Sequence, residues 1–227
     1  MQDNSPAPDL QHHSSLAAVL MAAGAGARMG QRPKSLLELD GMPLICRHVM
    51  GLRQAGVSEL VLVLGHHAKD IQAAVKALNV SVVINPDPDA GPVGSQRLGL
   101  QSLSGHSDAV LMALADQPLL DAADLRQLVQ AFHQRPPGCS LLYPRVAGQP
   151  GNPVIFTAGV RAALLASPPE VGCKHWRQAH TSQVQALDCD NLHFVQDVDT
   201  PDDIAALRRS SGRHLQWPTP WQRPGDT

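Results

Sequence analysis

Residues 20–30 of this chain read Leu-Met-Ala-Ala-Gly-Ala-Gly-Ala-Arg-Met-Gly, and they follow a short apolar run over residues 16–20. We predict that the apolar run is a β-strand and that the glycine-rich stretch is a turn with exposed backbone N–H groups. Small residues leave room for an anion, and each free amide can donate a hydrogen bond to it. Arg28 and Lys34 add positive charge, which arginine supplies as a two-pronged donor and lysine as a mobile point charge. The stretch therefore predicts a polyphosphate site at the N-terminal edge of an α/β sheet.

Three known glycine-rich loops compete for this stretch. A Walker A loop ends in Gly-Lys followed by Ser or Thr, and that ending is absent. The dinucleotide fingerprint needs Gly-x-Gly-x-x-Gly, but here Gly30 follows Gly26 one residue too late. The stretch resembles instead the signature Leu-Ala-Ala-Gly-x-Gly-x-Arg-Met-Gly…Lys of nucleotidyltransferases that transfer NMP from an NTP. A structural Ala/Gly turn is the plain alternative, and the ordered Arg28, Gly30 and Lys34 argue against it.

The composition is that of one globular α/β domain. The chain has 227 residues, of which 43% are hydrophobic and 17% charged, so it can bury a sizeable core. A net charge of −2 and only 3% aromatic residues argue against a nucleic-acid partner. No apolar run approaches the roughly 20 residues that span a bilayer, and the N-terminus lacks the features of a secretory signal. Four scattered cysteines read as reduced thiols, so we expect a cytoplasmic protein with no membrane partner.

Apolar runs and helical patterns alternate along most of the chain. The expected strands span residues 16–20, 60–64, 80–84 and 109–115, and the expected helices span residues 44–52, 71–78 and 122–133. Asp121 is a favourable N-cap for the third of these helices. Strands that alternate with helices imply a three-layer α/β/α architecture with a mostly parallel sheet.

The pattern changes after about residue 138. Residues 140–146 and 153–156 flank a glycine- and proline-containing turn at 148–151, which predicts a small β-hairpin lobe beside the main sheet. A last helix is expected after Thr200, because Thr200 and Asp203 have the spacing of a capping box.

These patterns divide the chain into three parts. We expect a loose tail over residues 1–15, a single catalytic domain over residues 16–209 and a C-terminal tail over residues 210–227. The C-terminal tail is polar and rich in proline, and it contains Trp217 and Trp221. It is therefore expected either to be flexible or to dock on a surface.

Two aspartate-containing segments predict a metal site. Asp116 follows an apolar run at the carboxyl end of a predicted strand, where open α/β sheets bind ligands, and Pro118 stops the strand there. Asp197 and Asp199 belong to a second segment, which we also place at a strand end with both side chains on one face. Mg²⁺ usually takes one or two carboxylates plus substrate phosphates. We therefore expect Asp116 and Asp199 to hold Mg²⁺; the plain alternative is that each is a cap or turn residue.

Together, the motifs resemble those of the molybdenum cofactor nucleotidyltransferases, and most closely the cytidylyltransferase branch, over roughly residues 17–207. The resemblance rests on the glycine-rich stretch, Lys34–Ile45, Asp116-Gln117-Pro118, Gly151-Asn152-Pro153-Val154 and Asp197–Asp203, in that order. It implies a Rossmann-like nucleotidyltransferase fold. It also implies a reaction in which the terminal phosphate of molybdopterin attacks the α-phosphorus of an NTP, and pyrophosphate leaves.

The resemblance further implies roles for individual residues. Arg28, Lys34 and Asp116 would be catalytic, because they would hold the triphosphate and stabilise the leaving pyrophosphate. Mg²⁺ would be the cofactor, on Asp116 and Asp199. The nucleotide would contact Ala22, Ala23, Gly24, Gly26, Gly30, Gly91, Pro92 and Ser95.

The choice of base follows two segments that point in different directions. In this family Ala-Ala-Gly in the first loop goes with CTP, and Ala-Gly-Gly goes with GTP. The Ala23 methyl would limit space near the base and favour a pyrimidine. Gly91 is followed by Pro92, which is seen in guanylyltransferases, whereas the cytidylyltransferase branch usually has Gly-Met-Ser-x-Ser. CTP is therefore the expected substrate, and GTP is the alternative.

The acceptor side of the reaction is the last expectation. Asn152 stands where the family often has His, and Lys174 and Arg177 would contact the pterin phosphate unless they form a solvated helix face. The expected partners are CTP or GTP, molybdopterin and an apo-molybdoenzyme that receives the product. The alternatives are transfer to a sugar phosphate or a methylerythritol phosphate, or a non-catalytic chaperone that hands over the cofactor.

Overall fold

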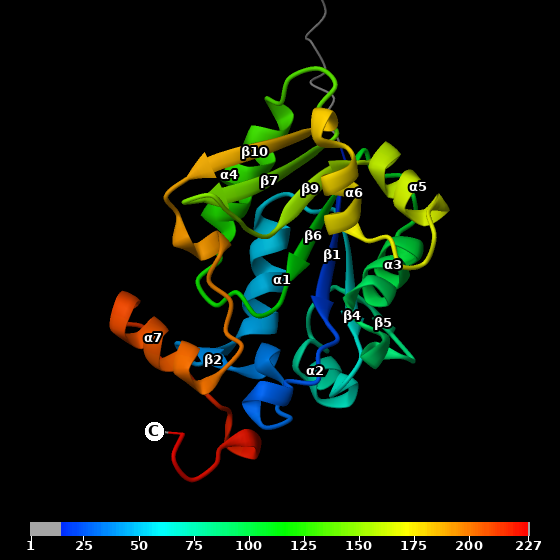
Figure 1. The fold of residues 1–227 in the computed structure, drawn as a ribbon. Coiled ribbons are helices and arrows are strands. Elements are labelled where there is room, and N and C mark those ends of the chain that lie inside the picture. Colours follow the sequence, from blue (N-terminus) through cyan, green and yellow to red (C-terminus); the bar gives the residue numbers. More distant parts are fainter. Residues whose placement is uncertain (1–14, 227) are drawn as a thin grey trace, which may run out of the picture.

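The computed structural model describes residues 15–226, so nearly all of the expected N-terminal tail lies outside the described part of the chain. Its centre is an eight-stranded sheet with the order β10-β7-β9-β6-β1-β4-β5, in which β8 pairs with β7 (Figure 1). The strands are β1 (Leu16–Ala22), β4 (Glu59–Leu64), β5 (Ser81–Ile84), β6 (Ala109–Leu114), β7 (Leu141–Val146), β8 (Gln149–Pro150), β9 (Val154–Thr157) and β10 (Val184–Cys189).

The sheet is mostly parallel, as predicted. β1 lies between β4 and β6 and runs parallel to both, and β5 and β10 are parallel to their neighbours. β9 is antiparallel to both β6 and β7, and β8 is antiparallel to β7. The expected hairpin is therefore present, and it forms part of the sheet itself because β9 pairs with β6.

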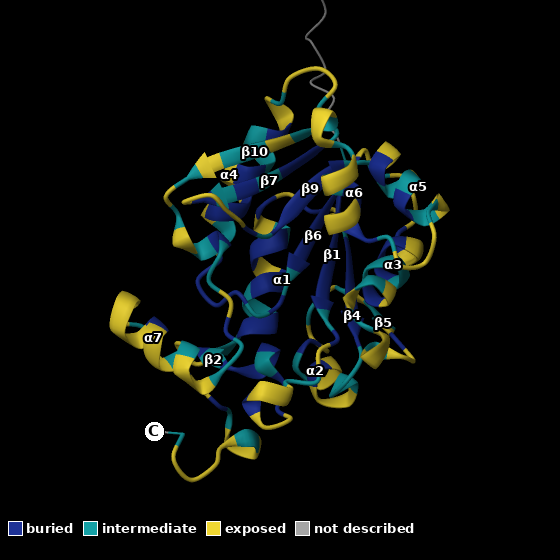
Figure 2. Cartoon of the chain, viewed as in Figure 1, coloured by how far each residue is buried: buried dark blue, intermediate teal, exposed yellow. Residues whose placement is uncertain are grey.

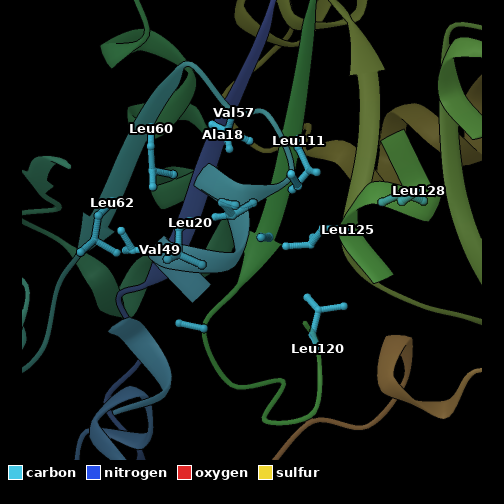
Figure 3. Close-up of a cluster of buried hydrophobic side chains, with 14 of the residues drawn as sticks. Ala18, Leu20, Val49, Val57, Leu60, Leu62, Leu111, Leu120, Leu125 and Leu128 are labelled. Atoms are coloured by element: carbon cyan, nitrogen blue, oxygen red, sulfur yellow. The ribbon is translucent and has the colours of Figure 1, made fainter. Parts of the chain in front are cut away.

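Helices cover both faces of the sheet and complete the three layers. They are α1 (Leu44–Gln54), α2 (Ala68–Ala74), α3 (Pro92–Ser102), α4 (Ala122–His133), α5 (Ala158–Ala166) and α6 (Cys173–Ala179). Apolar side chains of α1, α2 and α4 pack on one face of the sheet, and those of α3, α5 and α6 pack on the other. Figure 3 shows side chains of β1, β4 and β6 meeting those of α1 and α4.

The burial pattern explains why the central strands are apolar throughout. Val19, Leu62 and Leu111 have no exposed surface, because helices cover both sides of their strands. Figure 2 shows the same arrangement, with buried strands at the centre and exposed residues on the outer sides of the helices. Two predicted helix starts are confirmed as capping boxes, at Asp121 for α4 and at Thr200 for α7 (Pro201–Ser211).

A second, smaller sheet lies beside the main one. It has the order β11-β2-β3 and consists of β11 (Leu215–Gln216), β2 (Glu38–Leu39) and β3 (Met42–Pro43). Leu215 and Trp217 are buried in a third apolar cluster with residues of the glycine-rich stretch and α7. The segment after α7 is thus docked on the domain. Within residues 15–226, no helix is long and apolar enough to cross a membrane.

Candidate functional site

A cleft of about 300 Å³ opens where β1 and β6 end side by side. The parallel pairing of these strands places the glycine-rich turn after β1 next to Asp116, which follows β6. The walls of the cleft are formed by Met21, Ala22, Ala23, Gly24, Pro33, Lys34, Ser35, Ile71, Pro88, Gly91, Pro92, Ser95, Gln96, Leu114, Ala115 and Asp116. Eight of the predicted site residues are among them: Ala22, Ala23, Gly24, Lys34, Gly91, Pro92, Ser95 and Asp116.

The turn after β1, which we call the glycine loop (residues 23–31), contains a short 3₁₀ helix at Ala27–Met29. Gly26 precedes this helix with φ 64° and Gly30 follows it with φ 70°, a backbone conformation that favours glycine. A Cβ on Gly26 would lie 1.9 Å from the Arg32 carbonyl oxygen, so no other residue fits there without movement. Gly26 and Gly30 lie outside the cleft wall, and their positive φ angles shape the loop.

The loop leaves a run of backbone donors free. Its internal hydrogen bonds use the amides of Met29, Gly30 and Gln31. Within residues 15–226, the amides of residues 24–28 donate to no protein acceptor. Successive free amides in a glycine-rich turn can bind an anion, so the loop has the free donors that the predicted polyphosphate site requires.

Four charged residues from three distant parts of the chain meet at the loop. Lys34 Nζ lies 2.7 Å from Asp116 Oδ2 and 2.6 Å from Asp199 Oδ1. Arg28 Nη2 lies 2.7 Å from Asp199 Oδ2, and the Arg28 side chain is two-thirds exposed. The structure therefore brings together the predicted cations and the predicted metal ligands, although Arg28 and Asp199 lie outside the cleft wall itself.

These contacts set the protonation states in the site. Burial lowers the pKa of Lys34, but attraction to Asp116 and Asp199 outweighs burial and the pKa is raised. Burial raises the pKa of Asp199, but hydrogen bonds and attraction to Lys34 and Arg28 outweigh it and the pKa is lowered. At neutral pH the cluster therefore holds a protonated Lys34 beside an ionised Asp199.

The prediction of a strand end at residues 197–199 is wrong. These residues form an irregular segment after the short 3₁₀ helix at Leu192–Phe194. The amide of Val198 donates to the carbonyl oxygen of Asp116, so the segment is held against the chain just after β6. Desolvation, and then repulsion from the Asp116 and Asp199 carboxylates, raises the pKa of Asp197 to about 7.

Sequence reasoning treated Gln117 only as part of a motif, whereas the structure gives it a role of its own. Gln117 is completely buried, and its Nε2 lies 2.9 Å from the carbonyl oxygen of Phe194. The same nitrogen lies within 3.4 Å of the carbonyl oxygens of Asn152 and His193. Gln117 thus ties the segment that leads to Asp199 to the end of β6. A polar residue between an apolar strand and a proline was the available signal.

The wall opposite the glycine loop is built by the start of α3. Gly91 has φ 100° and Pro92 is the first residue of the helix, which fixes how the chain enters it. The Ser95 hydroxyl is buried and accepts a 2.8 Å hydrogen bond from Asn85 Nδ2. Asn85 was missed by sequence analysis, because nothing in the local pattern distinguishes it from a turn residue.

The residues predicted to contact the acceptor are not brought to this cleft. Asn152 is half-buried, and its backbone amide donates to the carbonyl oxygen of Phe194. Lys174 is exposed on α6. The Arg177 guanidinium lies over the Tyr143 ring, 4.4 Å from its centre, and both residues line a second, open cavity of about 500 Å³.

Comparisons with known proteins agree with this geometry. A family model for the MobA-like NTP transferase domain matches residues 18–184, which include the glycine loop, Lys34 and Asp116. The chain belongs to the MobA-like NTP transferase family. It is a nucleotidyltransferase, and its α/β fold is the one that this family uses.

Relatives of this MobA-like protein carry different names. This chain is 30% identical over 197 residues to nicotine blue oxidoreductase of Paenarthrobacter nicotinovorans. The aligned region covers 83% of this chain and 94% of the relative. The chain is 33% identical over 141 residues to the bifunctional protein GlmU of Clavibacter sepedonicus, covering 61% of this chain but only 29% of GlmU. Family membership therefore leaves the substrates open.

Solved structures share the fold of this chain. Rv0371c of Mycobacterium tuberculosis H37Rv superposes with a TM-score of 0.71 and 28% identity, covering 87% of this chain and 99% of that protein. A manganese complex of the same protein has a TM-score of 0.66 and 27% identity, with 87% and 100% coverage. A 4-diphosphocytidyl-2C-methyl-D-erythritol synthase from Anaerococcus prevotii shares the fold at 16% identity, with a TM-score of 0.68 and coverage of 86% and 95%.

The carboxylates of Asp116 and Asp199 fit a divalent cation whose remaining ligands are phosphate oxygens. Asp116 Oδ1 is buried and has no hydrogen-bond partner among the described residues. The same part of the chain contains no group of three or more His, Cys, Asp or Glu side chains arranged to hold a metal. The other three oxygens of Asp116 and Asp199 contact Lys34 or Arg28, so Asp116 Oδ1 is the oxygen free for a cation. Mg²⁺ usually takes one or two carboxylates plus substrate phosphates.

Proposed function

We propose that this nucleotidyltransferase moves CMP from CTP to the terminal phosphate of molybdopterin, in a Mg²⁺-dependent reaction. An oxygen of the acceptor phosphate attacks the α-phosphorus, the bond between the α-phosphorus and the bridging oxygen to the β-phosphate breaks, and pyrophosphate leaves. The observation that carries the proposal is that Lys34 and Asp116 line one cleft, while the free loop amides, Arg28 and Asp199 adjoin them. No general base is needed, because the attacking phosphate is already an anion.

The residues of the cleft divide the work between binding and charge stabilisation. The free amides of the glycine loop, with Arg28 and Lys34, would hold the triphosphate and stabilise the charge that develops on pyrophosphate. Asp116 and Asp199 would hold Mg²⁺, whose charge offsets that of the phosphates. Lys34 is well placed to hold the triphosphate beside this metal site, because its ammonium group contacts both carboxylates.

The wall between the loop and α3 supports a cytosine base over a guanine. The main chain of residues 22–24 and the start of α3 face the same cleft, and Ala23 is largely buried there. A methyl group at Ala23 reduces the space for a purine, whereas Pro92 is the feature that favours GTP. CTP is therefore the proposed substrate, and GTP is the second candidate.

Support for the acceptor is the resemblance of five ordered motifs to molybdenum cofactor enzymes. Asn152, Lys174 and Arg177 are the proposed contacts to the pterin phosphate, although all three lie outside the wall of the cleft. The separate cavity that Arg177 lines has room for a ring system. An apo-molybdoenzyme is the proposed recipient of the product. Mg²⁺, CTP and molybdopterin thus complete the proposed reaction.

The test is a direct incubation. The purified protein with MgCl₂ is given CTP, GTP, ATP or UTP in separate reactions, with molybdopterin, a sugar phosphate or methylerythritol phosphate as the acceptor, and the products are identified by mass. The proposal expects a molybdopterin cytosine dinucleotide as the main product. A molybdopterin guanine dinucleotide as the main product would show that GTP, and not CTP, is the nucleotide substrate. Transfer only to a sugar phosphate or to methylerythritol phosphate, or binding of molybdopterin without any transfer, would overturn the acceptor or the reaction.

A further inference from the structure

We propose that the C-terminal strap, residues 212–226, holds the glycine loop in its binding shape, with Arg32 and Asp226 as the principal positioning pair. The inference rests on the proposed role of the glycine loop as the triphosphate site. The strap lies outside residues 18–184, which the family model matches. Figure 1 shows the red C-terminal segment beside the blue segment that follows β1, although Arg32 and Asp226 are 194 residues apart in sequence.

Arg32 is the centre of the first contact. Its side chain is only 6% exposed, and its Nη1 lies 2.6 Å from Asp226 Oδ2 and 3.2 Å from the Trp221 carbonyl oxygen. The guanidinium also lies over the Trp217 ring, 4.1 Å from its centre. Through Nε, the same side chain donates a 2.9 Å hydrogen bond to the carbonyl oxygen of Met29 in the loop. One buried cation therefore joins the strap to the end of the loop helix.

Arg223 makes a second contact on the outer side of the loop. Its Nη2 donates a 2.9 Å hydrogen bond to the carbonyl oxygen of Gly30. A Cβ on Gly30 would lie 2.6 Å from Arg223 Nη1, so the strap packs directly on a position that only glycine leaves open. Asp226 also accepts a 2.7 Å hydrogen bond from the amide of Arg223, which couples the two contacts.

Trp221 makes a third, indirect contact with the loop through His67. Its ring meets the edge of the His67 ring at 88°, with centres 5.4 Å apart. His67 Nε2 in turn lies 3.2 Å from the carbonyl oxygen of Ala25. The strap therefore braces the loop at three carbonyl groups, those of Ala25, Met29 and Gly30, either directly or through one side chain.

The strap contacts carbonyl groups of the glycine loop and leaves its amide groups free. The bracing contacts use carbonyl oxygens, whereas the amides of residues 24–28 keep their donors available for an anion. Arg28, which contacts Asp199, belongs to the same three-residue helix. A single 3₁₀ turn has few internal bonds to keep its shape. Loss of the Asp226 charge would leave the Arg32 guanidinium buried with fewer partners, which favours opening of the strap.

The test compares Asp226→Asn with the wild-type chain and with three other variants. Asp226→Glu keeps the charge and should restore wild-type behaviour. Arg223→Gln removes the Gly30 contact at an exposed site and is expected to fold. Glu170→Gln removes an exposed carboxylate that has no partner among the described residues, and it is the matched control.

Two measurements separate positioning from general destabilisation. In Asp226→Asn and Arg223→Gln, KM for CTP should rise about tenfold, the loss expected for one charge-assisted hydrogen bond, while KM for molybdopterin stays within twofold. Amide hydrogen exchange should become faster at Met29, Gly30 and Gln31, whose amides are hydrogen-bonded within the loop, and stay unchanged in β1 and β6. Unchanged loop exchange together with an unchanged KM for CTP would overturn the proposal.

The exchange measurement needs no substrate, so it tests the strap even where the proposed reaction fails. If the wild-type chain transfers nothing to molybdopterin but loop exchange responds to Asp226→Asn, the proposed function fails and the strap stands. If the wild-type chain is active and every variant behaves like Glu170→Gln, the strap fails and the function stands.

Discussion

At the scale of single residues, the site depends on Lys34, whose ammonium group contacts two carboxylates from distant parts of the chain. Asp116 follows β6 and Asp199 precedes α7, and Lys34 lies within 2.7 Å of an oxygen of each. In the absence of nucleotide this cation offsets their mutual repulsion. We propose that the same charge contacts the phosphates when a nucleotide binds.

Replacement of the two cations tests this assignment. Lys34→Ala and Arg28→Ala should each slow NMP transfer by about 30- to 1,000-fold, because a charge-assisted phosphate contact is worth roughly 2–4 kcal/mol in such a site. Steady-state rates with saturating acceptor provide the measurement. Lys76→Ala, which replaces an exposed lysine in the turn after α2, is the matched control. Losses below threefold in both variants would place the triphosphate elsewhere.

Replacement of the proposed metal ligand gives a second test. Asp116→Asn should reduce transfer by about 100-fold or more, the scale for losing one preorganised charge in an active site, and should raise the Mg²⁺ concentration needed for half-maximal rate. The fold should survive, because Asp116 is partly exposed. Asp190→Asn, which removes an exposed carboxylate outside the site, is the control. Wild-type activity and Mg²⁺ dependence in Asp116→Asn would remove the metal assignment.

Ala23 gives a third test at this scale. Ala23→Gly should raise kcat/KM for GTP relative to CTP, because one methyl group in a pocket discriminates by about 1–3 kcal/mol at most. The shift should be partial, since Pro92 stays in place. An unchanged ratio would assign base choice to residues 91–95, and a wild-type preference for GTP would overturn the cytidylyltransferase assignment.

At the scale of elements, helix caps and tight turns place the site residues. The Asp203 carboxylate in the capping box of α7 accepts hydrogen bonds from the amides of Asp199 and Thr200, at 2.9 and 2.7 Å. The cap that begins α7 therefore also fixes the backbone of Asp199. The sequence pattern predicted this cap, but it placed Asp199 on a strand, because a capping box says nothing about the segment before it.

Two glycines of the loop make a matched prediction. Gly26→Ala should lower the melting temperature and weaken CTP binding, because the new Cβ meets the Arg32 carbonyl and the positive φ costs about 1–2 kcal/mol. A Cβ at Gly24 meets nothing within 4 Å, so Gly24→Ala should keep the melting temperature and affect only nucleotide binding. Equal melting temperatures for the two variants would contradict the loop geometry described above.

At the scale of the whole molecule, the order of strands creates the cleft, and local sequence predicts only part of that order. Apolar runs such as residues 60–64 predicted buried parallel strands, and these are confirmed. The insertion of β9 between β6 and β7 and the pairing of β11 with β2 depend on contacts between distant segments. The Arg32–Asp226 pair spans 194 residues, so no local pattern could reveal it.

Stability against pH is a property of the whole fold, and His48 makes a specific prediction. Burial, with a smaller effect from Arg47, lowers the pKa of His48 to about 4 from its ordinary 6.5. The unfolded chain therefore binds this proton at a higher pH than the folded chain does. The free energy of unfolding should fall as pH drops from about 6.5 to 4, by up to about 1.4 kcal/mol per pH unit.

Denaturant titrations over this range provide the measurement. His48 Nε2 is buried without a hydrogen-bond partner among the described residues, so His48→Met removes the titrating group without breaking a bond at that atom. The variant should show a smaller loss of stability between pH 6.5 and 4. The same pH dependence in both proteins would show that other groups control it.

The central claim is that the cleft between the glycine loop and Asp116 transfers the nucleotidyl group, and isotope labelling tests it most directly. The protein, MgCl₂ and molybdopterin are incubated with CTP that carries ³²P at either the α- or the γ-phosphate, and the products are separated. The account predicts that α-label appears in the molybdopterin dinucleotide and γ-label in pyrophosphate. Transfer of γ-label to molybdopterin, or label that stays in CTP throughout, would contradict it.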